Sequence, residues 1–127
     1  MRNFYSYLVH KSAKSPLSIL KHTYGYDQFR GQQAEIIDYI VGGGDAFVLM
    51  PTGSGKSLCY QIPAMCREGV GVVVSPLIAL MQDQITALEQ LGIAAGAINS
   101  GMPPAEVFHV KQKLEKNQLD LLYVAPE

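Results

Sequence analysis

The chain has 127 residues, the size of one domain or of part of one, which is long enough to bury a sizeable core. Its formal net charge of −1 and hydrophobic content of 48% are ordinary for a globular protein, so any contact with nucleic acid must come from a local site. No apolar run approaches the length of a membrane span and residues 1–15 lack the apolar core of a signal peptide, so we expect no membrane partner and no secretion.

The first part of the chain predicts two helices and one strand. Residues 1–14 show no clear period, and we expect them to form a loosely held arm. Ser15-Pro16 places an N-cap residue before a proline at the first helical position, and this pair predicts a helix over 15–24. A second helix is expected over 31–41, where isoleucines recur on one face. The short apolar run 46–50 then predicts a buried strand.

Strands and helices alternate in the rest of the chain. The run 71–75 is apolar and rich in β-branched residues, which is typical of a strand covered on both faces. Pro63 has no N–H to donate, so the helix that begins at Ser57 should end or kink there. The alternation predicts an α/β fold, a mostly parallel sheet flanked by helices. The remaining expected elements are a helix over 78–91, a strand over 94–98, a helix over 103–116 and a strand over 121–124.

The stretch 50–57 reads Met-Pro-Thr-Gly-Ser-Gly-Lys-Ser and is the most informative in the chain. It matches the phosphate-binding loop G-x-x-x-x-G-K-[ST] except that Met50 occupies the first glycine position. A glycine turn between a strand and a helix N-terminus can direct backbone N–H groups at an anion. A chance glycine-rich turn before a lysine is disfavoured by this strand and helix context. The expected phosphate-binding residues are Thr52, Gly53, Ser54, Gly55, Lys56 and Ser57, with Ser57 also suited to bind Mg²⁺.

Three further segments accompany this loop: Tyr24-Gly25-Tyr26-Asp27-Gln28-Phe29-Arg30-Gly31-Gln32-Gln33, then Ser57-Leu58-Cys59-Tyr60-Gln61-Ile62-Pro63-Ala64, then Val73-Val74-Ser75-Pro76-Leu77-Ile78-Ala79-Leu80-Met81-Gln82-Asp83-Gln84. In this order they resemble the RecQ family of superfamily-two DNA helicases, over roughly 17–127. The resemblance implies that 15–127 form the N-terminal, incomplete part of a RecA-like ATP-binding motor domain. It also implies roles in DNA recombination and repair.

In that family the segment before the phosphate-binding loop recognises the adenine base of the nucleotide. Carried over by position, Tyr26 and Arg30 would sandwich the base and Gln33 would hydrogen-bond its edge. The chemistry is suitable, because an amide carries a donor and an acceptor, and an aromatic ring and a guanidinium can both stack on a base. The family usually has Pro-Gly where this chain has Gly31-Gln32, so Gln32 is an alternative candidate for the residue that hydrogen-bonds the adenine edge. On the residues alone, the simpler interpretation is favoured, with Tyr26 and Phe29 as core aromatics and Gln33 as a solvated helix residue; the resemblance favours adenine recognition instead.

The resemblance also implies contacts with single-stranded or partially duplex DNA, through Ser75, Pro76 and Leu77 and, further on, through Asn99 and Ser100. A hydroxyl and N–H groups at a helix start suit a phosphate without net positive charge. The simpler alternatives are a helix cap at Ser75 and a plain turn at Asn99. The lysines at 111, 113 and 116 are expected to lie on a solvated helix face.

A P-loop ATPase also needs an acidic residue at the end of another buried strand. No strand expected here is followed by Asp-Glu, and in the family Leu-Leu-Tyr-Val-Ala-Pro-Glu closely precedes the Asp-Glu-Ala-His strand, where this chain stops. The second helicase lobe is absent as well. The resemblance therefore implies an ATP-dependent 3′→5′ DNA helicase with ATP and Mg²⁺ as cofactors and Lys56 as the residue acting on the phosphates. This chain would be its ATP-binding portion, inactive alone; the alternative is a non-catalytic nucleotide- or DNA-binding relative.

Overall fold

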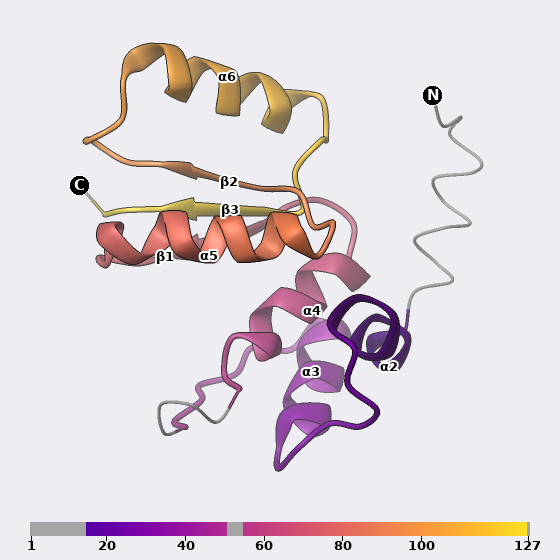
Figure 1. Ribbon diagram of the computed structural model, residues 1–127. Helices are drawn as coiled ribbons and strands as arrows, with labels where there is room; N and C mark the ends of the chain where they lie inside the picture. The colour runs from indigo at the N-terminus through magenta and orange to yellow at the C-terminus, as the bar shows by residue number, and fades with distance from the viewer. Residues whose placement is uncertain (1–14, 51–54, 127) are drawn as a thin grey trace. The chain divides into compact units, whose positions relative to one another are not determined.

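The computed structural model describes residues 15–50 and 55–126. The chain divides into two compact units, Met1–Glu68 and Gly69–Glu127. Figure 1 shows helices in the first unit and three strands with two helices in the second. Within the described residues, none of the helices has the length and apolar character needed to cross a membrane.

The described part of the first unit is helical. A short helix begins after Ser15, whose Oγ accepts a hydrogen bond from the Ser18 N–H at 3.1 Å, as the Ser-Pro pair predicts. It runs on into a π-helical turn that ends at Gly25 in the left-handed conformation, φ 78°. The elements are α2 (Pro16–Ile19), η1 (Leu20–Tyr24), α3 (Gln33–Val41) and α4 (Leu58–Cys66).

The core of this unit is formed where α3 packs against α4 and α2 contacts both. Ile37 of α3 and Ile62 of α4 are completely buried. Cys59 is buried beside them, and this burial raises the pKa of its thiol. Cys66 is only half-buried, and neither cysteine forms a disulfide. Pro63 does not end α4, which continues to Cys66.

The expected strand over 46–50 is wrong. Residues 44–50 have no regular secondary structure, and the side chains of Phe47 and Leu49 are 89% and 84% exposed. A strand is stabilised by hydrogen bonds to a neighbouring strand, and the three strands of the described residues pair only with one another. Within the described part of the chain, residues 46–50 therefore lack the strand partner that their apolar sequence would need.

The second unit is a three-stranded parallel sheet in the order β1-β3-β2. Gly71 and Ala95 both pair with Leu121, which fixes the register on either side of the central strand. Leu121 and Tyr123 of β3 are almost fully buried. In Figure 1 the sheet lies between α5 and α6, as right-handed crossovers in opposite directions require. The elements are β1 (Gly71–Val74), α5 (Ile78–Gln90), β2 (Ala95–Ile98), α6 (Pro104–Glu115) and β3 (Leu121–Val124).

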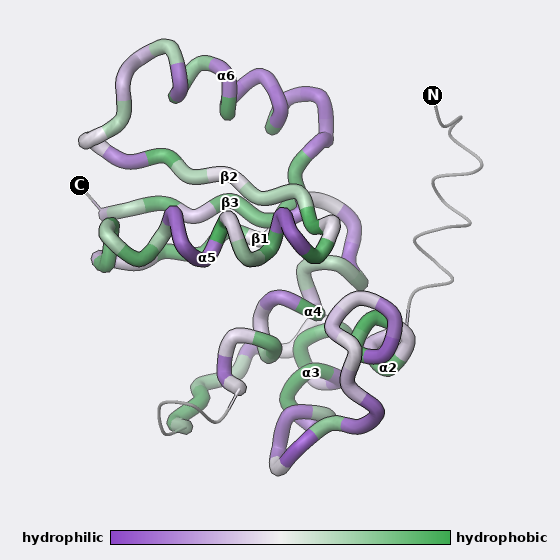
Figure 2. The backbone as a smooth tube through the Cα atoms, viewed as in Figure 1, coloured by the Kyte–Doolittle hydropathy of each residue, from purple (hydrophilic) through white to green (hydrophobic). Residues whose placement is uncertain are grey.

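The parallel α/β arrangement and the elements over 71–124 are confirmed, with one correction. Strand β1 is not covered on both faces, because Val72 and Val74 are 58% and 66% exposed. These two side chains share one face of an edge strand. Figure 2 shows that α6 is largely hydrophilic, and none of its residues is fully buried.

Candidate nucleotide and nucleic-acid sites

The end of the glycine loop has a conformation that only glycine adopts without strain. Gly55 has φ +81°, in the left-handed region. A Cβ on Gly55 would also collide with the side-chain nitrogen of Gln33. The backbone at Gly55 is thus held against another segment of the same unit. Thr52, Gly53 and Ser54 lie outside the described residues.

Lys56 and Ser57 follow at the start of α4, and both are exposed. Ser57 is the N-cap residue of this nine-residue helix, but its hydroxyl makes no capping hydrogen bond. Its carbonyl accepts from the Gln61 N–H at 3.0 Å, which starts the helical ladder. A helix N-terminus with an adjacent ammonium group and a hydroxyl not used for capping is suited to bind an anion.

Gln33 joins the glycine loop to the segment that precedes α3. Its Nε2 donates to the carbonyl of Gly55 at 3.1 Å, and its Oε1 accepts from the Arg30 N–H at 2.9 Å. The side chain is only 2% exposed, so the interpretation of Gln33 as a solvated helix residue is wrong. Gln32, the alternative candidate for adenine recognition, is exposed. An amide has two N–H groups and two oxygen lone pairs, and the hydrogen bonds of Gln33 to the described residues use one of each.

Tyr26 and Arg30 lie in the loop between η1 and α3. Tyr26 is 58% exposed, which excludes a core role for its ring within this structure. Its backbone N–H donates to the Leu20 carbonyl at 3.1 Å, so the residue is fastened to η1. The Arg30 guanidinium lies near Gly55, 3.9 Å from the position a Cβ would take there. An accessible ring and an accessible guanidinium are the groups that base stacking needs, and the stacking itself stays a prediction.

A second set of expected residues meets at one edge of the sheet in the other unit. Ser75 follows β1 and Asn99 follows β2, and the carboxyl ends of parallel strands share an edge. The Ser75 Oγ accepts from the Leu77 N–H at 3.1 Å, and the Asn99 Oδ1 accepts from the Gly101 N–H at 2.9 Å. Both side chains therefore close turns. Ser75 is not the N-cap of α5, because that position belongs to Leu77.

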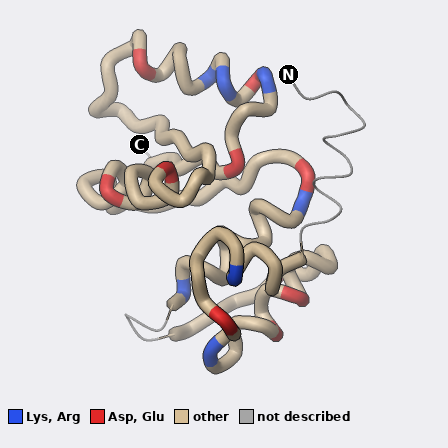
Figure 3. The backbone as a smooth tube through the Cα atoms, turned by 45° about the vertical axis from the view of Figure 1, so that its right-hand side comes forward, with Lys and Arg blue, Asp and Glu red and all other residues tan. Residues whose placement is uncertain are grey.

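Around these turns the remaining expected DNA contacts are accessible. Pro76, Leu77 and Ser100 are exposed, so the surface at the ends of β1 and β2 presents backbone and hydroxyl groups to solvent. Lys111 and Lys113 are exposed on α6, as expected of a solvated face. Figure 3 shows that α6 carries both acidic and basic residues, so it does not form a uniformly basic surface.

One structural contact was not predicted from the sequence. The Tyr24 hydroxyl donates to Oε1 of Gln61 at 2.9 Å and links η1 to α4, the helix that begins at the glycine loop. Gln61 is buried among apolar residues of α4. A polar residue within the apolar run 58–65 is the signal that indicates such a partner, but it does not identify the partner.

Comparisons with known proteins agree with these features. A family model described as DEAD/DEAH box helicase matches residues 30–127. A relative named ATP-dependent DNA helicase RecQ, from Haemophilus influenzae, is 50% identical over 111 residues, covering 87% of this chain and 18% of the relative. ATP-dependent DNA helicase Q-like 4B of Arabidopsis thaliana is 49% identical over 109 residues, covering 84% of this chain and 10% of that protein. ATP-dependent DNA helicase Q1 of Mus musculus is 42% identical over 111 residues, covering 86% of this chain and 17% of that protein. The chain thus spans less than a fifth of the length of each of these relatives.

Proposed function

Since this chain belongs to the DEAD/DEAH box helicase family and resembles its RecQ members most in these comparisons, we propose that it is the ATP-binding front part of an ATP-dependent 3′→5′ DNA helicase. Residues 15–127 would form the N-terminal part of the first motor domain, and a second lobe would complete the motor. The observation that carries the proposal is the double hydrogen bond of Gln33, which joins the base-reading segment to the glycine loop. This contact holds together two segments that are about twenty residues apart in the sequence, and the proposal assigns the base to one of them and the phosphates to the other.

The residues present fit a nucleotide phosphate. The left-handed backbone at Gly55 and the close approach of Gln33 shape the end of the loop, and the N-terminus of α4 follows directly. Lys56 would neutralise the β- and γ-phosphates, and the Ser57 hydroxyl would bind Mg²⁺. Bound Mg·ATP would supply the phosphoanhydride whose hydrolysis drives a helicase.

The base would lie beside the segment 26–33. Tyr26 and Arg30 offer an aromatic and a guanidinium surface, and both are accessible. The remaining donor and acceptor of the Gln33 amide match the N6–H and N7 edge of adenine. This assignment distinguishes ATP from GTP, because guanine presents an acceptor where adenine presents the N6 donor.

Single-stranded DNA would follow the edge at Ser75, Pro76, Leu77, Asn99 and Ser100. The support for this assignment is that these residues gather at the carboxyl ends of neighbouring parallel strands. Hydroxyl, amide and backbone groups there suit phosphate oxygens.

Nucleotide binding is tested with the 127-residue chain and fluorescent ATP and GTP analogues. Lys56→Ala should reduce affinity for both nucleotides by about tenfold or more, because it removes the charge on the phosphates. Lys21→Ala is the matched control, because Lys21 is an exposed residue of η1, and it should change the affinity for neither nucleotide. Unchanged affinity in Lys56→Ala contradicts the phosphate assignment.

The base assignment has its own test, because Gln33 also supports the loop. Gln33→Glu keeps an oxygen acceptor for the Arg30 N–H but loses the donor to Gly55. We expect Gln33→Ala and Gln33→Glu both to lower the ratio of ATP to GTP affinity, whatever they do to total affinity. If both variants keep the ratio of the unaltered chain, Gln33 does not read adenine.

We further propose that residues 1–127 do not hydrolyse ATP by themselves, because none of the strands that the structure describes is followed by an Asp-Glu pair. Phosphate release with Mg²⁺ and single-stranded DNA should stay at the level of the Lys56→Ala variant. Release that is stimulated by DNA and abolished by Lys56→Ala contradicts this proposal. Binding without hydrolysis is also the behaviour of the alternative candidate, a non-catalytic nucleotide-binding relative.

A further inference from the structure

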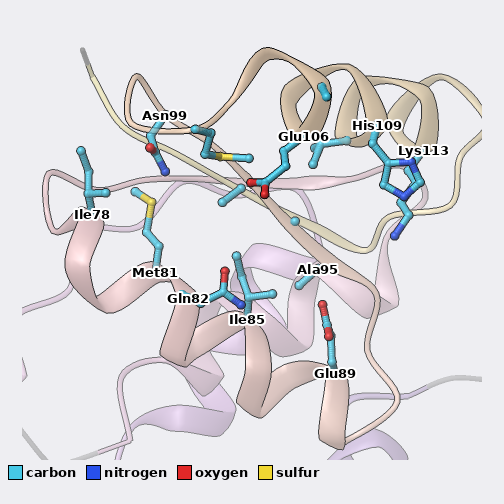
Figure 4. Close-up of a pocket in the computed structure, with 15 residues that line it drawn as sticks. Ile78, Met81, Gln82, Ile85, Glu89, Ala95, Asn99, Glu106, His109 and Lys113 are labelled. Carbon is cyan, nitrogen blue, oxygen red and sulfur yellow. The ribbon is translucent and has the colours of Figure 1, made fainter.

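A groove of about 680 Å³ lies in the second unit, along β2 and between α5 and α6. Figure 4 shows side chains of both helices directed into it, with β2 between them. Among the residues assigned above to nucleotide or DNA, only Asn99 lines this groove, at one end. Its remaining lining is not used by the proposed function.

The base of the groove is an unpaired strand edge. Within the described residues, strand β2 pairs with β3 on one side and has no strand on the other. The carbonyls of Ala94 and Ile98 accept from β3 and from the residue that follows it, so they point toward the sheet. Backbone groups of alternate residues in a strand point to opposite sides, so the N–H and C=O groups of Ala95 and Ala97 point away from β3, to the open edge.

The two walls of the groove differ in chemistry. A Cβ on Gly96 would lie 3.3 Å from Val110 Cγ1, so the face of β2 at Gly96 packs against α6. The other face, with Ala95 and Ala97, belongs to α5. The α6 side carries more ionisable groups than the α5 side. The α5 side supplies Ile78, Met81 and Ile85 together with Gln82 and Glu89, and the α6 side supplies Ala105 and Val110 together with Glu106, His109 and Lys113.

The charge of the groove is mixed but favours a cation. Glu106 on α6 and Glu89 on α5 direct carboxylates into it from opposite walls (Figure 4), and Lys113 is the only lysine or arginine among its lining residues. Facing carboxylates disfavour a nucleic-acid backbone and favour lysine or arginine side chains.

We propose that this groove binds an extended peptide segment of another protein as an additional strand on β2. Its backbone would pair with Ala95 and Ala97, and its side chains would alternate between the walls. Apolar side chains would lie against Ile78, Met81 and Ile85, and basic ones would face Glu106. The preferred sequence therefore alternates aliphatic and basic residues.

The probe is a fluorescent peptide of about eight residues that alternates valine with lysine, and its anisotropy is measured with the 127-residue chain. The chain should bind this peptide more tightly than a peptide with the same composition in two blocks, or one with glutamate in place of lysine. N-methylation of the backbone positions that would pair with β2 should abolish binding. Equal binding of the N-methylated peptide contradicts strand addition.

Matched variants locate the site. Glu106→Lys should weaken binding by about tenfold, whereas Glu115→Lys, exposed on the same helix but outside the groove, should change it by less than about twofold. Ala97→Pro removes an N–H that β3 does not use and should weaken binding without loss of folding, which circular dichroism checks. Should Ala97→Pro fail to fold, the N-methylated peptide decides the same point.

Two other outcomes overturn the proposal. Equal effects of Glu106→Lys and Glu115→Lys would mean that only surface charge is recognised. A concentration-dependent dimer of the chain that Glu106→Lys dissociates, with no peptide binding, would mean that the groove accepts a second copy instead.

Discussion

The contact between Gln33 and Gly55 organises the first unit at the level of single residues. The amide of Gln33 is buried, and both of its ends are hydrogen-bonded to backbone groups that lie on either side of it in the sequence. Glycine is favoured at position 55, because its φ lies in the left-handed region and a Cβ there would require the Gln33 side chain to move. A residue that was expected only to read a base therefore also shapes the loop beside it.

The sequence identified Gln33 and Gly55 separately but not their contact. Motif spacing and the family resemblance indicate residue types and roles, whereas a hydrogen bond across twenty-two residues depends on how α3 packs against α4. That packing is set by buried side chains such as Ile37 and Ile62, and periodicity predicts which face is buried without predicting its partner.

Gly55→Ala should affect both stability and binding. The left-handed φ costs an L-residue about 1–2 kcal/mol, and the new Cβ must in addition displace the Gln33 side chain. Gly43→Ala is the control, because Gly43 has φ 98° and open space around it in the same unit. Urea unfolding should show both losses, but only Gly55→Ala should lose nucleotide affinity; equal nucleotide affinity in the two variants would contradict the role of the contact.

At the scale of elements, the sequence predicted the second unit well. Three apolar runs became β1, β2 and β3, and the two amphipathic segments between them became α5 and α6. Local pattern is sufficient here because each strand has a partner within the same fifty-nine residues, Gly69–Glu127.

The same reasoning failed for residues 46–50, whose apolar run is as convincing as that of β1. The difference is the partner: β1 pairs with β3, and no strand of the described residues pairs with 46–50. The exposure of Val72 and Val74 has the same cause. A run of apolar residues indicates that a segment can be buried, but it does not identify the element that would pack against it.

The difference between a buried and an exposed apolar side chain predicts a large and a small loss of stability for two substitutions in the first unit. Ile62→Ala removes a completely buried side chain from α4 and should cost about 2–5 kcal/mol of unfolding free energy. Leu49→Ser changes an 84% exposed side chain and should stay within about 0.5 kcal/mol. Urea denaturation of the 127-residue chain measures both, and a Leu49→Ser loss as large as that of Ile62→Ala would mean that 46–50 is buried in solution.

At the scale of the whole molecule, the chain combines a helical unit that carries the expected nucleotide-site residues and a parallel α/β unit that carries the expected DNA-contact residues. The DEAD/DEAH box helicase model spans most of both, from 30 to 127. Because the RecQ relatives are more than five times as long as the matched segment, the motor cycle is a property proposed for the longer assembly of domains. What this chain itself should do is bind the nucleotide.

The most direct test of that claim is a titration of the ¹⁵N-labelled 127-residue chain with Mg·ATP, followed by backbone amide chemical shifts. We expect the largest shifts at Gly55, Lys56 and Ser57, with further shifts at Arg30 and Gln33, and the Lys56→Ala chain should show none of them at the same ATP concentration. Saturating ATP that leaves the amides of residues 55–57 unshifted, or that shifts only residues of Gly69–Glu127, would contradict the account.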